Sequence, residues 1–402
     1  MSAPRLEIHL ERLHHNARTL VERLARQGIA VTGVSKATLG LAEIVRTWVA
    51  AGVGSIGESR IETIEALGRS GMAVPMLLIR SPMLSQVERV VAHASISCNS
   101  EVRVLEALAA TAAHQGLRHG VLLMVELGDL REGILPADLE PVVRRTLALP
   151  NLLLMGIGTN LGCQHGIAPD AINMAELSRL ATALERRFAV RLPWCSGGNS
   201  ANLPWLAGGG DPGRINHLRL GEALLLGREP LGRTAIPGLY TDAITLVAEV
   251  IESKAKPSQA WGDRRLTSFS SAPHPGLPGP QPCADSPSVQ RALLALGEQD
   301  VDPAGLTPPG GVTIRGASSD HLVVESTGRP LQVGDEQRYQ LSYSALLRAM
   351  TSPFVSRRFV NGPCGRPLVA EAGAEAGPLH QASAGGGHLQ VRSRNRQFQD
   401  RQ

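Results

Sequence analysis

The sequence is poor in aromatic residues and in long apolar runs, and its charges nearly balance. Aromatics make up 3% of the 402 residues, which argues against a surface that stacks nucleic-acid bases. The net charge of +4 is too small to indicate a polyanionic partner. No apolar run approaches the ~18–20 residues of a membrane span, and the first segment of the chain lacks the apolar stretch of a signal peptide. We therefore expect a cytoplasmic protein that binds neither nucleic acid nor membranes.

Cysteine is also scarce, and its spacing is informative. The five cysteines are odd in number, scattered and never arranged as CxxC: they are Cys98, Cys163, Cys195, Cys283 and Cys364. This pattern argues against a disulfide framework and against a structural zinc site. We expect no metal site.

Short β-rich runs alternate with helical patterns over the first part of the chain. The predicted strands are 30–35, 53–56, 74–79, 94–97, 121–126, 152–157, 189–195 and 217–220. Their nearly continuous apolar character is typical of parallel strands buried on both faces. Helical spacing of apolar residues fills the intervals between them, and an amphipathic pattern at 11–27 precedes the first. Eight such units over roughly 200 residues predict an α/β fold, the (β/α)8 TIM barrel.

The pattern changes after about residue 230. The later β-leaning segments are short and separated by Gly/Pro turns: 242–252, 290–296, 311–315, 321–326 and 338–343. They predict a mostly β C-terminal domain. We therefore divide the chain into a barrel domain (1–230), a β-rich domain (235–360) and a tail (363–402) whose composition predicts disorder.

Lys36 follows the first predicted strand, in the segment AVTGVSKAT. A lysine in this position commonly extends its ammonium group to solvent and merely covers the strand end. The alternative is a Schiff-base amine, because a desolvated lysine is a nucleophile toward an aldehyde cofactor. In a TIM barrel, functional groups gather at the carboxyl ends of the strands, which is where this lysine stands.

Two other strand ends carry groups suited to an anion. The stretch 195–200 (CSGGNS) ends the seventh strand, and its glycines would admit a ligand to backbone N–H groups, although a plain loop-to-helix turn is the alternative. Arg219, Gly221 and Glu222 end the eighth strand. The arginine either forms a salt bridge or faces a ring nitrogen, which it would keep unprotonated. Barrels often bind phosphate after strands seven and eight.

Three polar clusters are less specific. They are Glu126 with 129–132 (DLRE), Cys163 with His165, and 318–321 (SSDH). Charged loop residues are usually solvated, and a lone histidine is usually structural. A Cys/His nucleophile would also need a third group to orient it, and the sequence does not identify one.

Taken together, eight motifs resemble those of a known family. In chain order they are VTGVSKAT, SIGESRIETIEAL, VELGDLREGI, GIGTNLGC, SGGNSANL, HLRLGEALLLGRE, GASSDHL and SYSALLRAMTSPFV. They resemble the ornithine racemases, pyridoxal-phosphate enzymes of the alanine-racemase-like group (fold type III), over roughly residues 5–360. The resemblance implies a barrel followed by a β domain, pyridoxal 5'-phosphate as cofactor, a homodimer, and racemisation of ornithine or another basic amino acid.

The resemblance also implies roles for the strand-end residues. Lys36 matches the lysine that carries the cofactor as a Schiff base. Arg219 matches the arginine facing the pyridine nitrogen, which would leave the ring a weaker electron sink and so disfavour transamination. Ser200, with the backbone of Gly221 and Glu222, matches the phosphate site.

Further matches concern the ring and the substrate. Asn160 stands where alanine racemases have a histidine beside the ring, and Arg131 matches a supporting arginine near the cofactor. The pair Ser319–Asp320 matches a segment near the substrate carboxylate. A cationic substrate side chain would want a carboxylate partner. The open choices for it are Glu126, Asp129, Glu132 and Asp320.

The departures from alanine racemase leave the second acid/base undefined. Gly40 stands where that enzyme has a tyrosine, Glu298 where it has its catalytic tyrosine, and a late phosphate-contacting tyrosine falls near 351–352. Racemisation needs a proton donor or acceptor on each face of Cα. Lys36 would serve one face, and the candidates for the other are Glu298, Cys163, His165 and His321.

Two other functions compete with a racemase. One is a non-catalytic pyridoxal-phosphate carrier or homeostasis protein, although relatives of that kind lack a second domain. The other is a lyase or aldolase of the same fold type. These resemble the chain less and usually carry a metal site near the C-terminus, for which the sequence offers no clear ligand pair.

Overall fold

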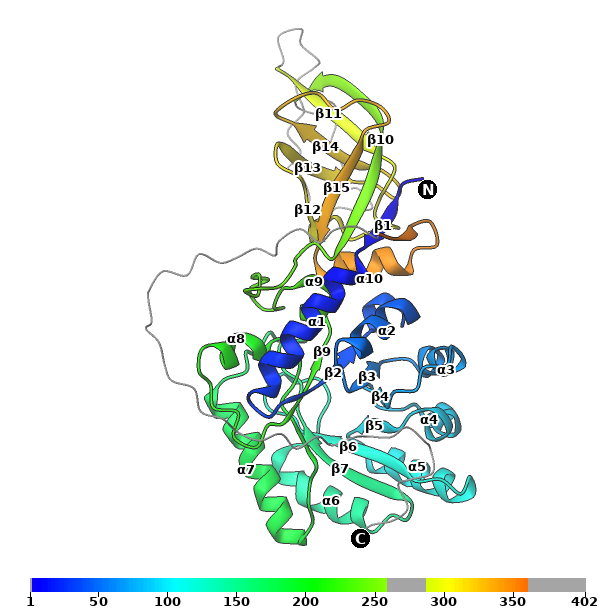
Figure 1. Cartoon of the computed structure of the whole chain (residues 1–402), viewed down its shortest axis with the longest axis vertical. Helices are drawn as coiled ribbons and strands as arrows, with labels where there is room; N and C mark the ends of the chain where they lie inside the picture. The colour runs from blue at the N-terminus through cyan, green and yellow to red at the C-terminus, as the bar shows by residue number, and fades with distance from the viewer. Residues whose placement is uncertain (1, 259–286, 361–402) are drawn as a thin grey trace, which may run out of the picture.

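The computed structural model describes residues 2–258 and 287–360, which form a barrel and a separate β-sheet (Figure 1). The predicted disordered tail, Cys283 and Cys364 lie outside these ranges. Within them, no helix is both long and apolar enough to cross a bilayer.

Eight parallel strands close into the barrel, in the order of the sequence. They are β2 (Ala30–Val34), β3 (Ser55–Glu58), β4 (Met76–Leu78), β5 (Ile96–Asn99), β6 (His119–Met124), β7 (Leu152–Gly158), β8 (Trp194–Ser196) and β9 (His217–Leu220). Each overlaps one of the predicted strands, so the predicted TIM barrel is confirmed. Part of the interior is an apolar cluster of Leu77, Ile96, Cys98, Leu122 and Met124. The interior is therefore a packed core, as in other TIM barrels.

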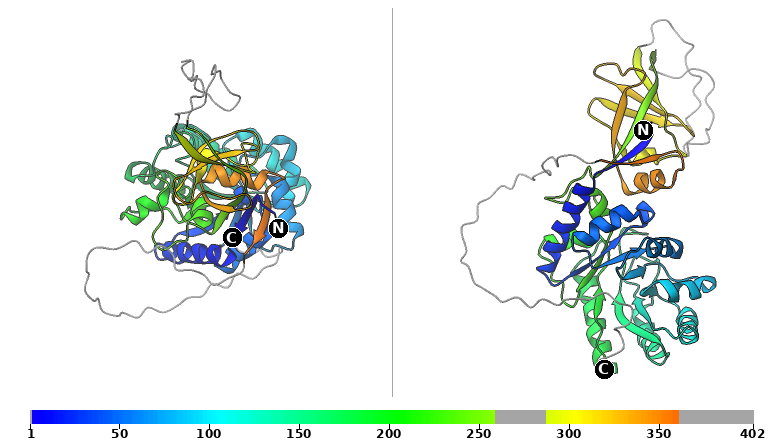
Figure 2. Two further views of the ribbon diagram at one scale, coloured as in Figure 1. Left: turned by 90° about the horizontal axis from the view of Figure 1, so that it is seen from above. Right: turned by 45° about the vertical axis from the view of Figure 1, so that its right-hand side comes forward.

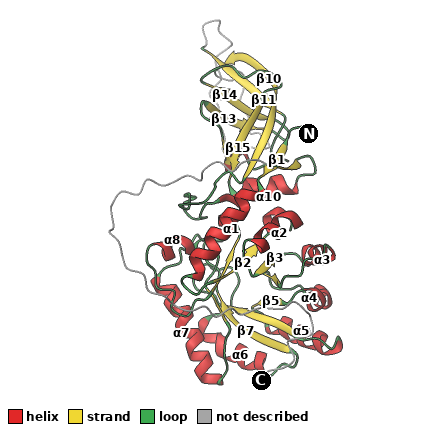
Figure 3. Cartoon of the chain, viewed as in Figure 1, coloured by secondary structure: helices red, strands yellow, loops and turns green. Residues whose placement is uncertain are grey.

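Helices surround the strands, as Figure 3 shows in red around yellow. They are α1 (Leu10–Ala25), α2 (Ala42–Ala50), α3 (Ile61–Arg69), α4 (Val87–His93), α5 (Val102–His114), α6 (Leu139–Leu147), α7 (Ala171–Phe188), α8 (Asn202–Ala207) and α9 (Glu222–Leu226). Their apolar residues bury one face each against the barrel, which is what the helical spacing predicts. The Asp170 carboxylate caps α7 by accepting from the backbone N–H groups of Ile172 and Asn173.

The second half of the chain forms an antiparallel sheet above the barrel in the view of Figure 1. Its strands are β10 (Ile244–Pro257), β11 (Ser288–Leu294), β12 (Leu306–Thr307), β13 (Val312–Ala317), β14 (Leu322–Ser326) and β15 (Glu336–Leu341), in the order β12-β15-β10-β11-β14-β13. The predicted mostly β architecture is confirmed. Helix α10 (Tyr343–Thr351) follows and packs against η1 (Lys36–Thr38), the single turn after β2. The sheet is thus attached to the barrel at the end where η1 lies, and the right-hand view of Figure 2 shows the sheet above the barrel.

The sequence analysis assigned no strand to the first residues, yet the structure has one there. β1 (Arg5–Ile8) pairs antiparallel with β10 and parallel with β16 (Ser356–Phe359). The N-terminal strand therefore belongs to the sheet formed mainly by the last third of the chain.

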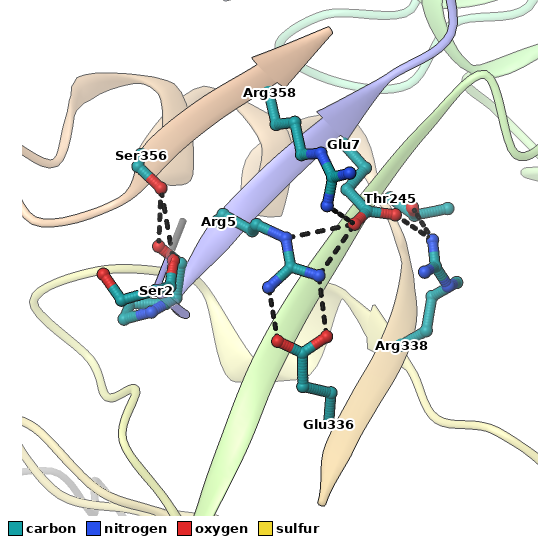
Figure 4. Close-up of polar contacts among 9 residues, drawn as sticks. Ser2, Arg5, Glu7, Thr245, Glu336, Arg338, Ser356 and Arg358 are labelled. Atoms are coloured by element: carbon teal, nitrogen blue, oxygen red, sulfur yellow. Dashed lines mark hydrogen bonds and ion pairs between the residues drawn. The ribbon is translucent and has the colours of Figure 1, made fainter. Parts of the chain in front are cut away.

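Charged side chains on β1 reinforce this pairing (Figure 4). Arg5 and Glu7 are both buried, and the Arg5 guanidinium donates to Glu7 Oε1 from Nε at 3.0 Å and to Glu336 Oε2 from Nη2 at 2.7 Å. Arg338 donates to the other oxygen of Glu7, and Arg358 lies 3.8 Å from the Glu7 carboxylate. These contacts keep the pKa of Glu7 below its usual value although burial opposes them. The cluster links strands that are far apart in the sequence.

Candidate active site

Four neighbouring strands bring the predicted site residues to one end of the barrel. β2 pairs with β9, β9 with β8, and β8 with β7. Lys36 begins η1 just after β2, and Gly221 follows β9 so closely that a Cβ on it would lie 3.2 Å from the Val34 carbonyl oxygen. The carboxyl ends of parallel strands meet at one edge, so Lys36, Asn160, Ser200 and the segment 219–222 surround one opening.

Arg219 is held firmly at this end of the barrel. Its guanidinium is buried, and Nη2 donates to the Thr159 carbonyl oxygen at 2.6 Å while Nη1 donates to Ser196 Oγ. A Cβ on Gly158 would lie 2.9 Å from Ser196 Cβ and 3.4 Å from Arg219 Nη1. The absence of a side chain at Gly158 therefore leaves room for the guanidinium.

A second corner of the opening carries hydroxyl groups. Ser200 is buried, and its Oγ accepts from the Ala223 backbone N–H at 3.2 Å. Burial raises the pKa of Glu222 to about 7. Tyr343, the first residue of α10, is mostly buried, and this burial together with the Glu222 carboxylate raises the pKa of its phenol. Ser200, Glu222 and Tyr343 therefore gather where the phosphate of the expected cofactor would lie.

No tyrosine stands at 351–352, and the site includes a tyrosine that was not predicted from the sequence, Tyr343. Thr351 Oγ1 donates to carbonyl oxygens of the last turn of α10, and Ser352 Oγ donates to Asp300 at 2.8 Å. Both hydroxyls are thus used at the helix end, whereas Tyr343 packs with α10 against η1. The signal that could have found it is its place directly after the N-cap Ser342, in the motif SYSALLRAM.

A buried carboxylate beside Lys36 was also missed. Glu58 ends β3, is 1% exposed and accepts a hydrogen bond from Ser35 Oγ. Burial raises its pKa to about 7, and the charge of Lys36 opposes that rise. Gly40 has φ +61°, and a Cβ there would lie 2.3 Å from Thr63 Cγ2 and 3.4 Å from Glu58 Oε1. The place where alanine racemases carry a tyrosine is therefore closed to any side chain, and Glu58 lies next to it.

The loop after β7 carries Asn160 and the Cys/His pair. Asn160 Nδ2 donates to Cys163 Sγ at 3.0 Å, and its Oδ1 accepts from Asn199 at 3.1 Å. His165 Nδ1 is hydrogen-bonded to the Asp129 carbonyl oxygen at 2.8 Å. Cys163 and His165 thus contact different partners and do not form a nucleophilic pair with each other.

The four carboxylates considered for a cationic substrate differ in their contacts. Glu126 accepts from three backbone N–H groups of its own loop, and Asp129 accepts from three in the loop 163–165. Asp320 pairs with His321 at 2.9 Å. Among the described residues, the side-chain partner of Glu132 is its neighbour Arg131, whose guanidinium donates to the carboxylate at 2.8 Å.

Among these four carboxylates, Glu132 is also the one whose pKa is affected by the charges of the predicted cofactor residues Lys36 and Arg219. Burial raises its pKa, while the charges of Arg131, Arg219 and Lys36 oppose the rise. Its carboxylate therefore lies within electrostatic range of Lys36 and Arg219.

Two candidates for the second acid/base lie in the β-sheet half instead. Glu298 pairs with Arg348 of α10 at 3.0 Å, and its backbone N–H donates to Ser318. His321 pairs with Asp320. These residues stand on loops of the sheet, apart from the barrel loop that carries Cys163.

The donors at the opening fit a phosphorylated ring with an aldehyde. Lys36, Arg131 and Arg219 supply positive charge or an amine, and Ser200 and Tyr343 supply hydroxyl donors. In the described residues, no group of three or more His, Cys, Asp or Glu side chains could hold a metal ion.

Several known proteins are similar to this chain. Residues 8–229 match the family model described as alanine racemase, N-terminal domain. The chain is 37% identical to a lysine racemase of Thermotoga maritima over 89% of this chain and 98% of the relative. It is 34% identical to an ornithine racemase of Acetoanaerobium sticklandii over 89% of this chain and 99% of that protein.

Solved structures show the same fold at lower sequence identity. An alanine racemase from Streptomyces coelicolor superposes with a TM-score of 0.68 at 21% identity, covering 89% of this chain and 98% of the other. A D-threonine aldolase from Filomicrobium marinum gives 0.67 at 15% identity, covering 87% and 88%. The fold therefore serves more than one kind of enzyme, and the choice between them depends on the closer relatives and on the site.

Proposed function

The chain belongs to the alanine racemase family and is an amino-acid racemase, and we propose that it uses pyridoxal 5'-phosphate to interconvert the enantiomers of a basic amino acid, ornithine or lysine. The racemase activity follows from the lysine and ornithine racemases that match nearly the whole chain. The observation that carries the cofactor is the arrangement of Lys36, Arg219 and Ser200 around one end of the barrel.

Each of these residues has a proposed role. Lys36 carries the cofactor and exchanges the Cα proton on one face of the substrate. Arg219 keeps the ring nitrogen unprotonated, because a guanidinium does not give up its proton. Ser200, Tyr343 and the backbone of Gly221 and Glu222 hold the phosphate. Once bound, the cofactor supplies an electron sink for the pair of electrons left at Cα.

Two further barrel residues complete the proposed site. Asn160 lies beside the ring and presents its amide N–H to Cys163. Cys163 and His165 are both candidates for the second acid/base on the barrel: Cys163 Sγ accepts from the Asn160 and Asn199 amides, and His165 Nδ1 is hydrogen-bonded to the Asp129 carbonyl oxygen. Glu298 and His321 stay open as alternatives that the sheet of a second subunit would supply.

The test is to add pyridoxal phosphate to the purified protein and to follow optical rotation. We expect a yellow protein in which borohydride links the cofactor covalently to Lys36. The optical rotation of L-ornithine and L-lysine should be lost much faster than that of L-alanine. Lys36→Ala should lose both the colour and the activity. A protein that stays colourless with added cofactor would contradict the proposal, and release of an aldehyde or keto acid without racemisation would indicate a lyase.

The substrate side chain is proposed to meet Glu132. Replacing this carboxylate with an amide removes its charge and keeps its shape, so Glu132→Gln should lower kcat/KM for L-ornithine and L-lysine about 10-fold to 100-fold. Uncharged L-norleucine should be affected much less. The measurement is racemisation of the three substrates side by side.

Glu106→Gln on α5 is the matched control, since Glu106 pairs with Arg145 at the surface. It should leave all three rates unchanged. If Glu132→Gln lowers kcat/KM equally for charged and uncharged substrates, Glu132 does not bind the substrate side chain and instead holds Arg131 in place.

A homodimer and a cytoplasmic location complete the proposal. The elements that adjoin Lys36 expose apolar side chains, namely Leu39 after η1, Leu347 on α10 and Phe354 in the turn beyond it. Exposed apolar groups in one region favour an interaction surface. The cytoplasmic location rests on the sequence alone.

A further inference from the structure

A line of buried hydrogen bonds runs behind Arg219 through the barrel interior. Ser196 Oγ, which accepts from Arg219, lies 2.8 Å from His217 Nδ1. His217 Nε2 lies 2.7 Å from Thr32 Oγ1, and Thr32 Oγ1 lies 2.5 Å from Ser55 Oγ. The line thus crosses from β9 through β8 and back to β2 and β3, and all five side chains are buried.

His217 is the centre of this line, and its ring is fixed on every side. It is 1% exposed and stacks on the Trp194 indole, with 4.1 Å between ring centroids and 13° between planes. Burial, and then the charge of Arg219, lower its pKa to about 3. The imidazole is therefore neutral, with one N–H to donate and one ring nitrogen to accept.

The contacts select the direction of these hydrogen bonds. Ser196 Oγ already accepts from a cation, which makes its own hydroxyl hydrogen a better donor, and His217 Nδ1 is the acceptor in reach. The ring then carries its proton on Nε2 and donates to Thr32, which donates to Ser55. This order leaves the spare hydroxyl hydrogen on Ser55, which is 7% exposed, and not on Ser196, which is 0% exposed.

We infer that His217 is a positioning residue for Arg219: as a neutral Nε2–H imidazole it accepts from Ser196 and so locks the hydroxyl that holds the guanidinium against the cofactor site. The inference rests on the proposed function, because it assumes that Arg219 faces the ring nitrogen. If the Ser196 hydroxyl rotated freely, the Thr159 carbonyl oxygen would be the fixed acceptor that remains for Arg219. The guanidinium could then tilt.

The test uses three variants in this line. His217→Leu removes both ring contacts, and Ser196→Ala removes the acceptor itself. His217→Asn keeps an amide oxygen where Nδ1 stood, so it retains the acceptor for Ser196 and loses only the bond to Thr32. Each protein is loaded with pyridoxal phosphate, and kcat, KM, the cofactor dissociation constant and the absorption spectrum of the bound cofactor against pH are measured.

We expect His217→Leu and Ser196→Ala to lower kcat about 10-fold to 100-fold with little change in KM, and to shift the pH dependence of the cofactor absorption. His217→Asn should keep most of the wild-type kcat and a pH dependence of the cofactor absorption close to that of the wild type. The spectrum reports on Arg219 even if the substrate preference proposed above is wrong. A wild-type protein that binds no cofactor would instead contradict the proposed function.

His119→Leu is the matched control, because His119 is equally buried and its Nε2 lies 2.8 Å from Ser97 Oγ on β5, outside the line that holds Arg219. It should lower stability without moving the spectrum. The inference is overturned if His217→Leu and Ser196→Ala keep the wild-type spectrum and kcat, or if His119→Leu shifts both as strongly as His217→Leu does. Should His217→Leu fail to fold, the pair Ser196→Ala and His217→Asn still decides it.

Discussion

At the scale of single residues, the opening of the barrel concentrates polar groups that water barely reaches. Glu58 and Glu222 both have pKa values raised by burial to about 7, which means that their ionised forms are costly in the folded protein. Such costs are common at active sites, where the groups are retained for their chemistry and not for stability. Glu58, beside Lys36, is the clearest case.

The cost at Glu58 predicts a pH dependence of folding. Its pKa rises from 4.5 to about 7 on folding, so the folded protein holds more protons than the unfolded chain between these values. Its contribution to stability is complete below pH 4.5 and is lost as pH rises through 7. Glu58→Gln, whose amide oxygen still accepts from Ser35, should therefore be more stable than wild type at pH 8 by roughly 3 kcal/mol, and no more stable near pH 4.

Urea denaturation at several pH values measures this difference. Glu88→Gln, at the surface of α4, is the control and should follow the wild-type curve. A gap between Glu58→Gln and wild type that does not change with pH would show that Glu58 is not the group that titrates.

Gly158 predicts a second effect at this scale. A methyl group there would meet Ser196 at 2.9 Å, so Gly158→Ala should destabilise the protein by about 1–3 kcal/mol and weaken cofactor binding by displacing Arg219. Gly68→Ala on α3, where a Cβ meets nothing within 4 Å, should instead stabilise by about 0.5–1 kcal/mol. Denaturation and cofactor titration of both variants check the pair, and equal effects would contradict the steric argument.

The residues that could be predicted from the sequence are those at strand ends within motifs. Lys36 and Arg219 end apolar strands, and a parallel barrel must bring such ends together. Glu58 also ends a strand, but a single carboxylate in a loop motif looks solvated until its burial is known. His217 was not predicted because its role depends on partners in two other strands, β2 and β8, which no spacing along the chain reveals.

At the scale of the elements, the barrel strands were predictable and β1 was not. The eight barrel strands are apolar runs bounded by turns and helices, a pattern that burial on both faces requires. β1 has four residues, RLEI, of which two are charged, and it runs directly into α1. Its charges are buried only because Glu336 and Arg338 of β15 meet them, and that neighbour lies more than 300 residues away.

The cluster around β1 predicts a large effect from one substitution. Arg5→Ala removes one buried partner of the buried Glu7 and leaves only the more exposed Arg338 and Arg358 beside it among the described residues, so we expect a loss of about 3–5 kcal/mol. Arg18→Ala breaks an exposed pair with Glu22 on α1, which solvent screens, and should cost far less. Urea denaturation compares the two, and similar losses would mean that the buried cluster adds nothing to the pairing of β1.

At the scale of the whole molecule, the site opens toward the junction of barrel and sheet. Helix α10 belongs to the sheet half and covers η1 with Tyr343, so the two halves build one corner of the site together. Leu347 on the same helix is 41% exposed. The proposed homodimer would bury it.

Leu347→Asp should therefore weaken self-association. A charge introduced into an apolar contact loses its hydration when the contact forms, which opposes dimer formation. Leu147→Asp at the end of α6 is the control, because Leu147 is 40% exposed and lies at the opposite end of the barrel. Sedimentation at several concentrations measures both, and a wild type that is monomeric throughout would contradict the homodimer.

The pairing of β1 with β10 and β16 has a consequence for synthesis and truncation. Residues 5–8 leave the ribosome long before their antiparallel partner, which begins at Ile244, and their parallel partner, which ends at Phe359. A nascent chain can therefore close its barrel while this strand still waits for neighbours that are not yet made. Trimming the chain to begin at α1 would leave the barrel sequence whole and uncover an edge in the distant sheet.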